Sequence, residues 1–171
     1  MAKKSNIVLI GMPGAGKSTL GVVLAKILGM DFVDGDILIQ NQVGNTLQKI
    51  IDAQGVDGFL QVENDVLAAV DAQNTVISTG GSAIYSDEAM RHLTEIGTVV
   101  YLDVSLEELR SRLGSLHERG VVMRKGVSMS LDEIFEERGP LYRKYAEVTL
   151  QTDGLTVREA TRKLVDALSV M

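Results

Sequence analysis

The sequence contains Gly11-Met12-Pro13-Gly14-Ala15-Gly16-Lys17-Ser18, an octapeptide that matches the pattern G-x-x-x-x-G-K-[ST] at every fixed position. Residues 7–10 before it form a short apolar run of mostly β-branched side chains, which is typical of a buried strand. Residues 19–28 after it place apolar side chains at helical spacing, namely Leu20, Val23, Leu24, Ile27 and Leu28. Strand, glycine loop and helix together predict a phosphate-binding loop, or P-loop.

The residue types of this octapeptide suit the binding of a polyphosphate. Its glycines allow several backbone N–H groups to surround an anion, and the N-terminus of the following helix adds partial positive charge. Lys17 is placed to reach the β- and γ-phosphates, and the Ser18 hydroxyl to ligate Mg²⁺. A plain glycine turn before a helix is the alternative, which this spacing disfavours. We expect ATP and Mg²⁺ as cofactors, with the nucleotide-binding residues Gly11, Gly14, Ala15, Gly16, Lys17, Ser18 and Thr19.

The composition limits the classes of protein that this chain can belong to. Its 171 residues suit a single domain, residues 1–171, with a sizeable core. A net charge of −6 argues against a nucleic-acid-binding surface, and the absence of cysteine excludes disulfides and thiolate metal sites. No apolar run approaches the roughly 18 residues of a membrane span, and none resembles a signal peptide. We expect a monomeric cytoplasmic protein that acts on a small molecule, without a nucleic-acid or membrane partner.

Strands and helices alternate along the chain, which predicts an α/β protein with helices on both faces of a parallel sheet. Strands are expected at residues 7–10, 32–33, 75–78, 98–102 and 148–150. Helices are expected at residues 19–28, 37–43, 47–70, 87–96, 130–145, from about 105 and from about 156, with breaks near Gly44 and Gly55. Residues 114–128 combine three glycines with charged residues and show no sustained period, which predicts a mobile loop.

Two acidic residues, Asp34 and Asp36, follow the second expected strand. Alternation along a strand puts positions i and i+2 on the same side, and ligands of open α/β sheets bind beyond the carboxyl ends of the strands. The pair is suited to serve Mg²⁺ through water and to accept a proton from an attacking hydroxyl. The structural alternative is a solvated Asp-Gly turn in which Asp36 caps the next helix.

Two further strands end in residues that the site could use. Gly80-Gly81-Ser82 closes the third strand, where its backbone would allow a small substrate to approach closely, although a plain turn explains it equally well. Asp103 ends the fourth strand in the manner of a Walker B acid, or only terminates that strand and helps to cap the next helix.

Two arginines are candidates for binding anionic groups. Arg119 lies in the expected mobile loop and could close over the phosphates as an arginine finger in cis, or simply be solvated. Arg138 lies near an expected bend of the penultimate helix, where the alternative is a surface ion pair with its neighbours Glu136 and Glu137.

The sequence resembles the shikimate kinase family over nearly its whole length. The resemblance is carried by G-M-P-G-A-G-K-S-T at the P-loop, F-V-D-G-D, the F-x-x-x-E frame at Phe59–Glu63, S-T-G-G-S, V-V-Y-L-D, Arg119 and R-G-P-L-Y from Arg138. It implies a three-layer α/β/α fold of the nucleoside-monophosphate-kinase type, with a five-stranded parallel sheet in the order 2-3-1-4-5. It also implies a lid at about residues 114–128 that closes over ATP, and transfer of the γ-phosphate to the 3-hydroxyl of shikimate.

The resemblance also implies roles for individual residues. Asp34 would help to hold Mg²⁺, Asp36 would bind the acceptor hydroxyl and act as the base, and Arg138 would bind the substrate carboxylate. Arg119 would neutralise the transferring phosphate. The expected catalytic residues are therefore Lys17, Asp36 and Arg119, with Ser18 and Asp34 as magnesium ligands. The expected substrate-binding residues are Asp36, Leu60, Gly80, Gly81, Ser82 and Arg138.

The sequence departs from the family pattern in three places, and all concern the acceptor side or the lid. Leu60 stands where the family has an arginine that clamps the substrate carboxylate, and Ser82 replaces the third glycine of G-G-G. The lid sequence R-P-L-L is replaced at residues 119–122 by R-G-V-V. Shikimate is the leading acceptor, and another polyol or sugar acid such as gluconate is the alternative. A non-catalytic sensor that binds nucleotide or metabolite is the rival from another class.

Overall fold

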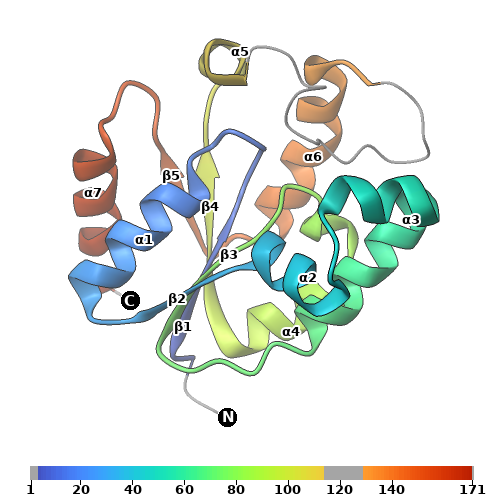
Figure 1. Cartoon of the computed structure of the whole chain (residues 1–171). Helices are drawn as coiled ribbons and strands as arrows, with labels where there is room; N and C mark the ends of the chain where they lie inside the picture. Colours follow the sequence, from blue (N-terminus) through green and yellow to red (C-terminus); the bar gives the residue numbers. More distant parts are fainter. Residues whose placement is uncertain (1–3, 114–128, 171) are drawn as a thin grey trace.

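The computed structural model describes residues 4–113 and 129–170, and Figure 1 shows the path of the chain. Its strands are β1 (Asn6–Ile10), β2 (Asp31–Asp34), β3 (Thr75–Ser78), β4 (Gly97–Asp103) and β5 (Val148–Gln151). Its α-helices are α1 (Lys17–Leu28), α2 (Gly35–Val43), α3 (Leu47–Ala68), α4 (Asp87–Ile96), α5 (Leu106–Leu113), α6 (Leu131–Tyr145) and α7 (Val157–Ser169). A short 3₁₀ helix, η1 (Ala83–Tyr85), follows β3.

The strands form one parallel sheet in the order β2-β3-β1-β4-β5, which confirms the expected order. The central strand β1 is buried along its whole length, as its apolar sequence indicated. The strand β2 is longer than expected, because its pairing with β3 runs from Asp31, opposite Thr75, to Asp34, opposite Ser78. This register brings the carboxyl ends of β1, β2 and β3 to one edge of the sheet.

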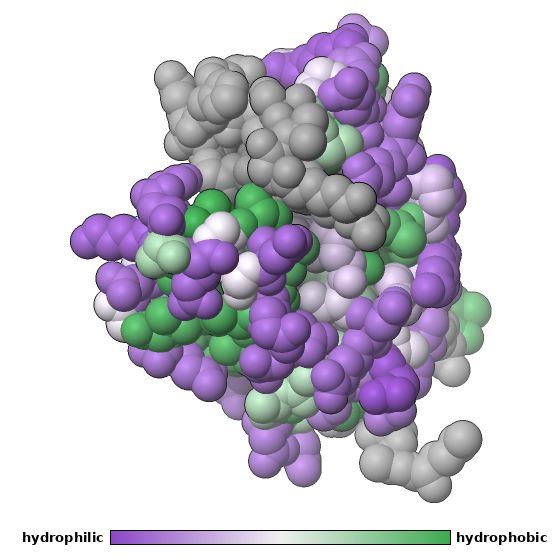
Figure 2. Space-filling view, turned by 90° about the vertical axis from the view of Figure 1, so that its right-hand side faces the viewer, coloured by the Kyte–Doolittle hydropathy of each residue, from purple (hydrophilic) through white to green (hydrophobic). Residues whose placement is uncertain are grey.

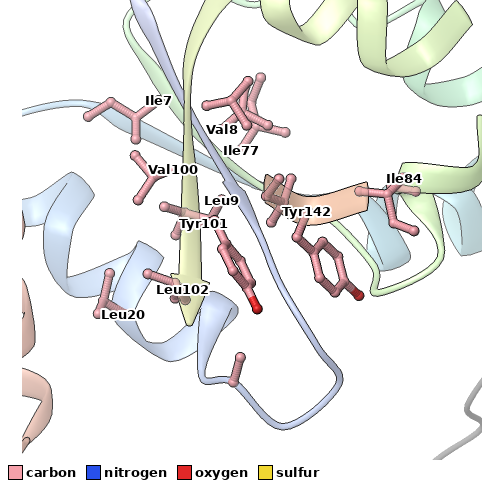
Figure 3. Close-up of a cluster of buried hydrophobic side chains, with 14 of the residues drawn as sticks. Ile7, Val8, Leu9, Leu20, Ile77, Ile84, Val100, Tyr101, Leu102 and Tyr142 are labelled. Carbon is pink, nitrogen blue, oxygen red and sulfur yellow. The ribbon is translucent and has the colours of Figure 1, made fainter. Parts of the chain in front are cut away.

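Helices cover both faces of the sheet, so the molecule has the expected three layers. Figure 1 shows α1 and α7 together on one side of the sheet, and α3, α4 and α6 on the other. Figure 3 shows how alternation along β4 serves both layers: Val100 and Leu102 point towards Leu20 of α1, and Tyr101 points to the opposite side, towards Tyr142 of α6. The core is therefore divided by the sheet into two apolar layers.

The helix termini were readable from the sequence because their caps are local. Ser130 and Thr156 each form a reciprocal capping box with the glutamate three residues later. Gly55 has a left-handed backbone (φ 72°) within α3, so the expected break lies there.

In the space-filling view of Figure 2, hydrophilic residues cover most of the face shown, with a smaller apolar area. Among the described helices, none is both long and apolar enough to cross a membrane.

Candidate active site

The P-loop connects β1 to α1 and requires glycine at several positions. Gly14 and Gly16 have positive φ angles of 82° and 90°. A Cβ atom on Gly11 would lie 2.8 Å from the Leu102 carbonyl oxygen, and one on Gly14 would lie 2.9 Å from the Leu113 side chain. The fixed glycines of the pattern therefore meet demands of this fold, and they leave the backbone open towards an anion.

Lys17 is buried at the first position of α1 and is held by the loop itself. Its Nζ donates hydrogen bonds to the carbonyl oxygens of Gly11 (2.8 Å) and Met12 (2.9 Å). Burial lowers the pKa of this ammonium to about 8, although the nearby Asp36 carboxylate favours its charged form. The negative charge of an incoming phosphate would stabilise the charged form of this buried lysine.

Ser18 and Asp34 bring oxygen atoms together beside the loop. The Ser18 hydroxyl donates to Asp34 Oδ2 at 2.6 Å and lies 3.3 Å from the Ser78 hydroxyl. The other oxygen of Asp34 accepts from the backbone N–H groups of Asp36 (2.9 Å) and Ile37 (3.3 Å). Asp34 rather than Asp36 therefore caps α2, which corrects the structural alternative considered for this pair.

Capping by Asp34 leaves the Asp36 side chain available at the first turn of α2. Burial, and then the negative charge of Asp34, raise the pKa of Asp36, whereas Lys17 opposes this shift. A Cβ atom on Gly80 would lie 2.7 Å from Asp36 Oδ1, so a side chain at that point of the β3–η1 loop would displace the Asp36 carboxylate. The carboxylate of Asp36 is thus held in a partly desolvated position against the glycine backbone.

A cavity of about 300 Å³ opens between the P-loop, α2, α3 and the β3–η1 loop. It is lined by most of the expected site residues: Gly14, Gly16, Lys17, Ser18, Thr19, Asp36, Gly80, Gly81, Ser82 and Arg138. Leu47, Phe59 and Leu113 add apolar walls that sequence reasoning missed. Leu60 does not line it among the described residues, because it packs half-buried against the cluster formed by α2 and α3.

Arg138 is buried, so it is not the surface residue of the structural alternative. Its side chain is only 1% exposed and lines the cavity. The Nε atom donates to the Tyr85 hydroxyl at 3.3 Å, and the guanidinium carbon lies 5.3 Å from the centre of the Tyr85 ring. Asp103, the other alternative acid, lies outside the described cavity lining and accepts a hydrogen bond from the Tyr101 hydroxyl at 3.1 Å.

Glu63 is a buried acid beside the cavity that the residue pattern did not single out for chemistry. Its carboxylate accepts from the Ser82 hydroxyl at 2.8 and 3.1 Å and has no exposed surface. A Cβ atom on Gly80 would lie 3.1 Å from Glu63 Oε2, so Glu63 and Asp36 approach the same glycine. Burial raises the pKa of Glu63 to about 7, an effect that the Ser82 hydrogen bond opposes and the Asp36 charge adds to.

We predict that Glu63→Gln makes the free energy of unfolding less dependent on pH. The pKa of Glu63 is raised from 4.5 to about 7, so its contribution to stability is lost as the pH rises through this window. Because one pKa unit corresponds to about 1.4 kcal/mol, the variant should gain about 2–3 kcal/mol on the wild type between pH 4.5 and 8. Urea unfolding at several pH values measures this difference. The control is Glu107→Gln at an exposed position, whose free energy of unfolding should change with pH as in the wild type. The prediction would be contradicted if the free energies of unfolding of Glu63→Gln and the wild type differed by the same amount at every pH.

A second cavity, of about 330 Å³, adjoins the P-loop on the side of α7. Gly14, Ala15, Gly16 and Thr19 line it together with Arg112, Thr152, Leu155 and Val157. The Thr152 hydroxyl is buried here without a hydrogen-bond partner among the described residues. Arg112 is oriented by Glu108, 2.8 Å away, and reaches towards the Gly14 carbonyl at 3.4 Å.

Arg119 and the whole expected lid, residues 114–128, lie outside the described residues.

A P-loop that opens on one side to a small cavity, lined by a partly buried acid and a buried arginine, is the arrangement of kinases that phosphorylate small molecules. The model of the shikimate kinase family matches residues 13–169, and the chain belongs to that family. A shikimate kinase of Francisella tularensis subsp. novicida is 37% identical over 166 residues, which cover 96% of this chain and 94% of the relative.

Solved structures agree with this assignment. The shikimate kinase from Acinetobacter baumannii in complex with shikimate has a TM-score of 0.85 at 30% identity, covering 97% of this chain and 93% of that one. The shikimate kinase from Bacteroides thetaiotaomicron has a TM-score of 0.81 at 28% identity, with coverages of 96% and 98%. The chain is accordingly an ATP-dependent small-molecule kinase.

Proposed function

We propose that this kinase transfers the γ-phosphate of Mg²⁺-ATP to a hydroxyl group of shikimate. The observation that carries the proposal is the position of Asp36, Gly80 and Arg138 around one cavity that begins at Lys17. That cavity offers a base, a close backbone approach and a cation for a carboxylate. The similar structure from Acinetobacter baumannii, which is a complex with shikimate, supports the same acceptor.

In this proposal, each described side chain has a separate task. Lys17 stabilises the charge on the transferring phosphoryl group, and Arg138 binds the acceptor carboxylate. Asp36 orients the acceptor hydroxyl and takes its proton as the oxygen attacks. A bond forms from that oxygen to the γ-phosphorus while the bond to the bridging oxygen of ADP breaks, so ADP leaves with the electron pair.

Ser18 and Asp34 are the residues that fit a magnesium ion. Their oxygens lie 2.6 Å apart beside the P-loop, and Mg²⁺ prefers oxygen ligands, usually few from the protein and the rest from phosphates and water. This sparse protein contribution agrees with the lack of a cluster of three or more metal-binding side chains in residues 4–113 and 129–170. Bound magnesium would neutralise charge on the β- and γ-phosphates.

The second cavity is suited to the nucleoside end of ATP. Ala15 of the P-loop and Thr19 of α1 line this cavity, so it adjoins the phosphate site. Its other walls include the apolar Leu155 and the guanidinium group of Arg112. The acceptor and the nucleoside would then lie on opposite sides of the loop. We propose that the enzyme acts as a monomer.

Leu60 and Ser82 favour a second candidate, a polyol or sugar acid of similar size. An arginine is absent at position 60, where the family pattern has one for the substrate carboxylate. A screen of shikimate, gluconate and related hydroxy acids by coupled ADP release tests the proposal. ADP release at a low concentration of shikimate supports shikimate as the acceptor. Faster turnover of another hydroxy acid would show that this other compound is the acceptor.

We predict that Leu60→Arg distinguishes the two acceptor classes. For shikimate, a second guanidinium should lower KM roughly tenfold, because charge-assisted contacts with a carboxylate are among the stronger polar interactions. For an acceptor without a carboxylate, the same change should raise KM, because it places an unpaired charge in a half-buried position. Steady-state kinetics on both acceptors measures this. Gln61→Arg adds the same charge at the exposed next position and should change neither KM, and an unchanged KM in Leu60→Arg would show that position 60 does not select the acceptor.

A further inference from the structure

Arg138 is packed so that little freedom remains to its guanidinium group. The Tyr85 ring lies on one side at 5.3 Å, and the Tyr85 hydroxyl accepts from Nε at 3.3 Å. Gly81 also lies close to the guanidinium group, because a Cβ atom added to this glycine would come within 2.9 Å of Arg138 Nη1. Arg138 also lines the cavity, where a guanidinium can bind a carboxylate by charge-assisted hydrogen bonds.

Tyr85 itself stands on a firmly anchored element. It ends η1, whose other residues, Ala83 and Ile84, are buried in the core. The same loop is fixed from α6, because the Tyr142 hydroxyl donates to the Gly81 carbonyl at 2.6 Å. Tyr142 also stacks on Tyr101 of β4 with ring centres 5.2 Å apart, and Figure 3 shows the two rings next to each other. The loop that leads into η1 is therefore tied to both β4 and α6.

A prearranged arginine matters more here than in a site with two clamping arginines. Position 60 holds a leucine, so the cationic side chains that line the cavity among the described residues are Lys17 and Arg138. Lys17 lies on the phosphate side, and Arg138 lies on the acceptor side. An arginine side chain has high rotamer entropy, and ordering it in advance avoids that cost when a ligand binds. Interaction with an aromatic face supplies such ordering.

We propose that Tyr85 is a positioning residue that presents Arg138 to the anionic group of the acceptor, so that it sets the preference for anionic over neutral acceptors. This inference rests on the proposed function, in which Arg138 binds a carboxylate. Tyr85 touches neither the reacting hydroxyl nor the phosphates in this arrangement. Its effect is accordingly on acceptor affinity and not on the chemical step.

The test compares Tyr85→Phe and Tyr85→Leu with the wild type. Tyr85→Phe keeps the ring and loses the hydroxyl, and should raise the KM for shikimate about threefold; Tyr85→Leu loses both and should raise it about tenfold or more. The kcat and the KM for ATP should remain within about twofold. Tyr145→Phe removes a near-surface hydroxyl that donates to Asp87, and should match the wild type as the control.

Calorimetric binding of shikimate and of its neutral methyl ester separates positioning from a general structural role. The Tyr85 variants should lose affinity for shikimate and keep the wild-type affinity for the ester. Equal weakening of both ligands, unchanged binding of shikimate in Tyr85→Leu, or a wild type that binds both ligands equally would overturn the inference. A wild type that binds shikimate in preference to the ester but does not phosphorylate it would overturn the proposed function alone.

Discussion

Lys17→Ala should lower kcat for phosphoryl transfer by at least about 10²–10³-fold, the loss typical when one preorganised charge-stabilising group is removed from an active site. Lys17 is the buried cation within the P-loop, and its Nζ is already directed by the Gly11 and Met12 carbonyls. The lost ammonium would otherwise stabilise negative charge as the γ-phosphoryl group moves. Coupled ADP release at saturating ATP and acceptor measures the effect.

Two controls keep this result interpretable. Lys26→Ala removes an exposed lysine from the last turn of the same helix and should leave kcat unchanged. Circular dichroism and thermal unfolding of Lys17→Ala should show a folded protein, because Lys17 does not belong to the apolar core. A folded Lys17→Ala variant with wild-type kcat would refute the assignment of this loop to phosphoryl transfer.

Asp36→Asn should lower kcat about 10²–10⁴-fold, the range attributed to a positioned general base. The amide can still accept a hydrogen bond from the acceptor hydroxyl, but it cannot take the proton. Binding of ATP should change little, because the P-loop contacts do not involve this side chain. Steady-state kinetics gives kcat, and calorimetry gives the dissociation constant of an ATP analogue.

The matched control is Asp31→Asn, which removes an exposed carboxylate from the start of β2 and should retain wild-type kcat. Asp34→Asn is a less suitable comparison, since Asp34 lies against Ser18 and is itself a proposed magnesium ligand. A kcat for Asp36→Asn within tenfold of the wild type would mean that another group accepts the proton.

The parts of the fold that were predictable are those with local causes. The P-loop octapeptide, the apolar run of β1 and the capping residues Ser130 and Thr156 each specify their own conformation, and the structure confirms them. The strand order was available only through the family resemblance, because the sequence does not state which strands lie side by side. It is confirmed as β2-β3-β1-β4-β5.

The parts that were missed depend on contacts between distant segments. Glu63 and Ser82 are separated by 19 positions, and nothing local in either segment shows that the hydroxyl would meet the carboxylate. The capping role of Asp34 instead of Asp36 was missed because the helix was expected to begin at residue 37, after both acids. The helix α2 begins at Gly35, so only Asp34 precedes it. The burial of Arg138 likewise follows from the position of η1, a short element without a sequence period.

The central position of β1 has a consequence for how the protein is made. Ile7 pairs with Val76 on one side and with Thr98 on the other, 69 and 91 positions later in the chain. At about 5–20 residues per second, a ribosome needs roughly 5–20 s to add the second of these partners after β1 has been synthesised. Until then, the apolar strand in front of the P-loop has at least one unpaired edge, and chaperones that shield such segments would meet it in that interval. A translation product that stops before β4 would carry the entire phosphate-binding sequence and leave β1 without its second partner strand.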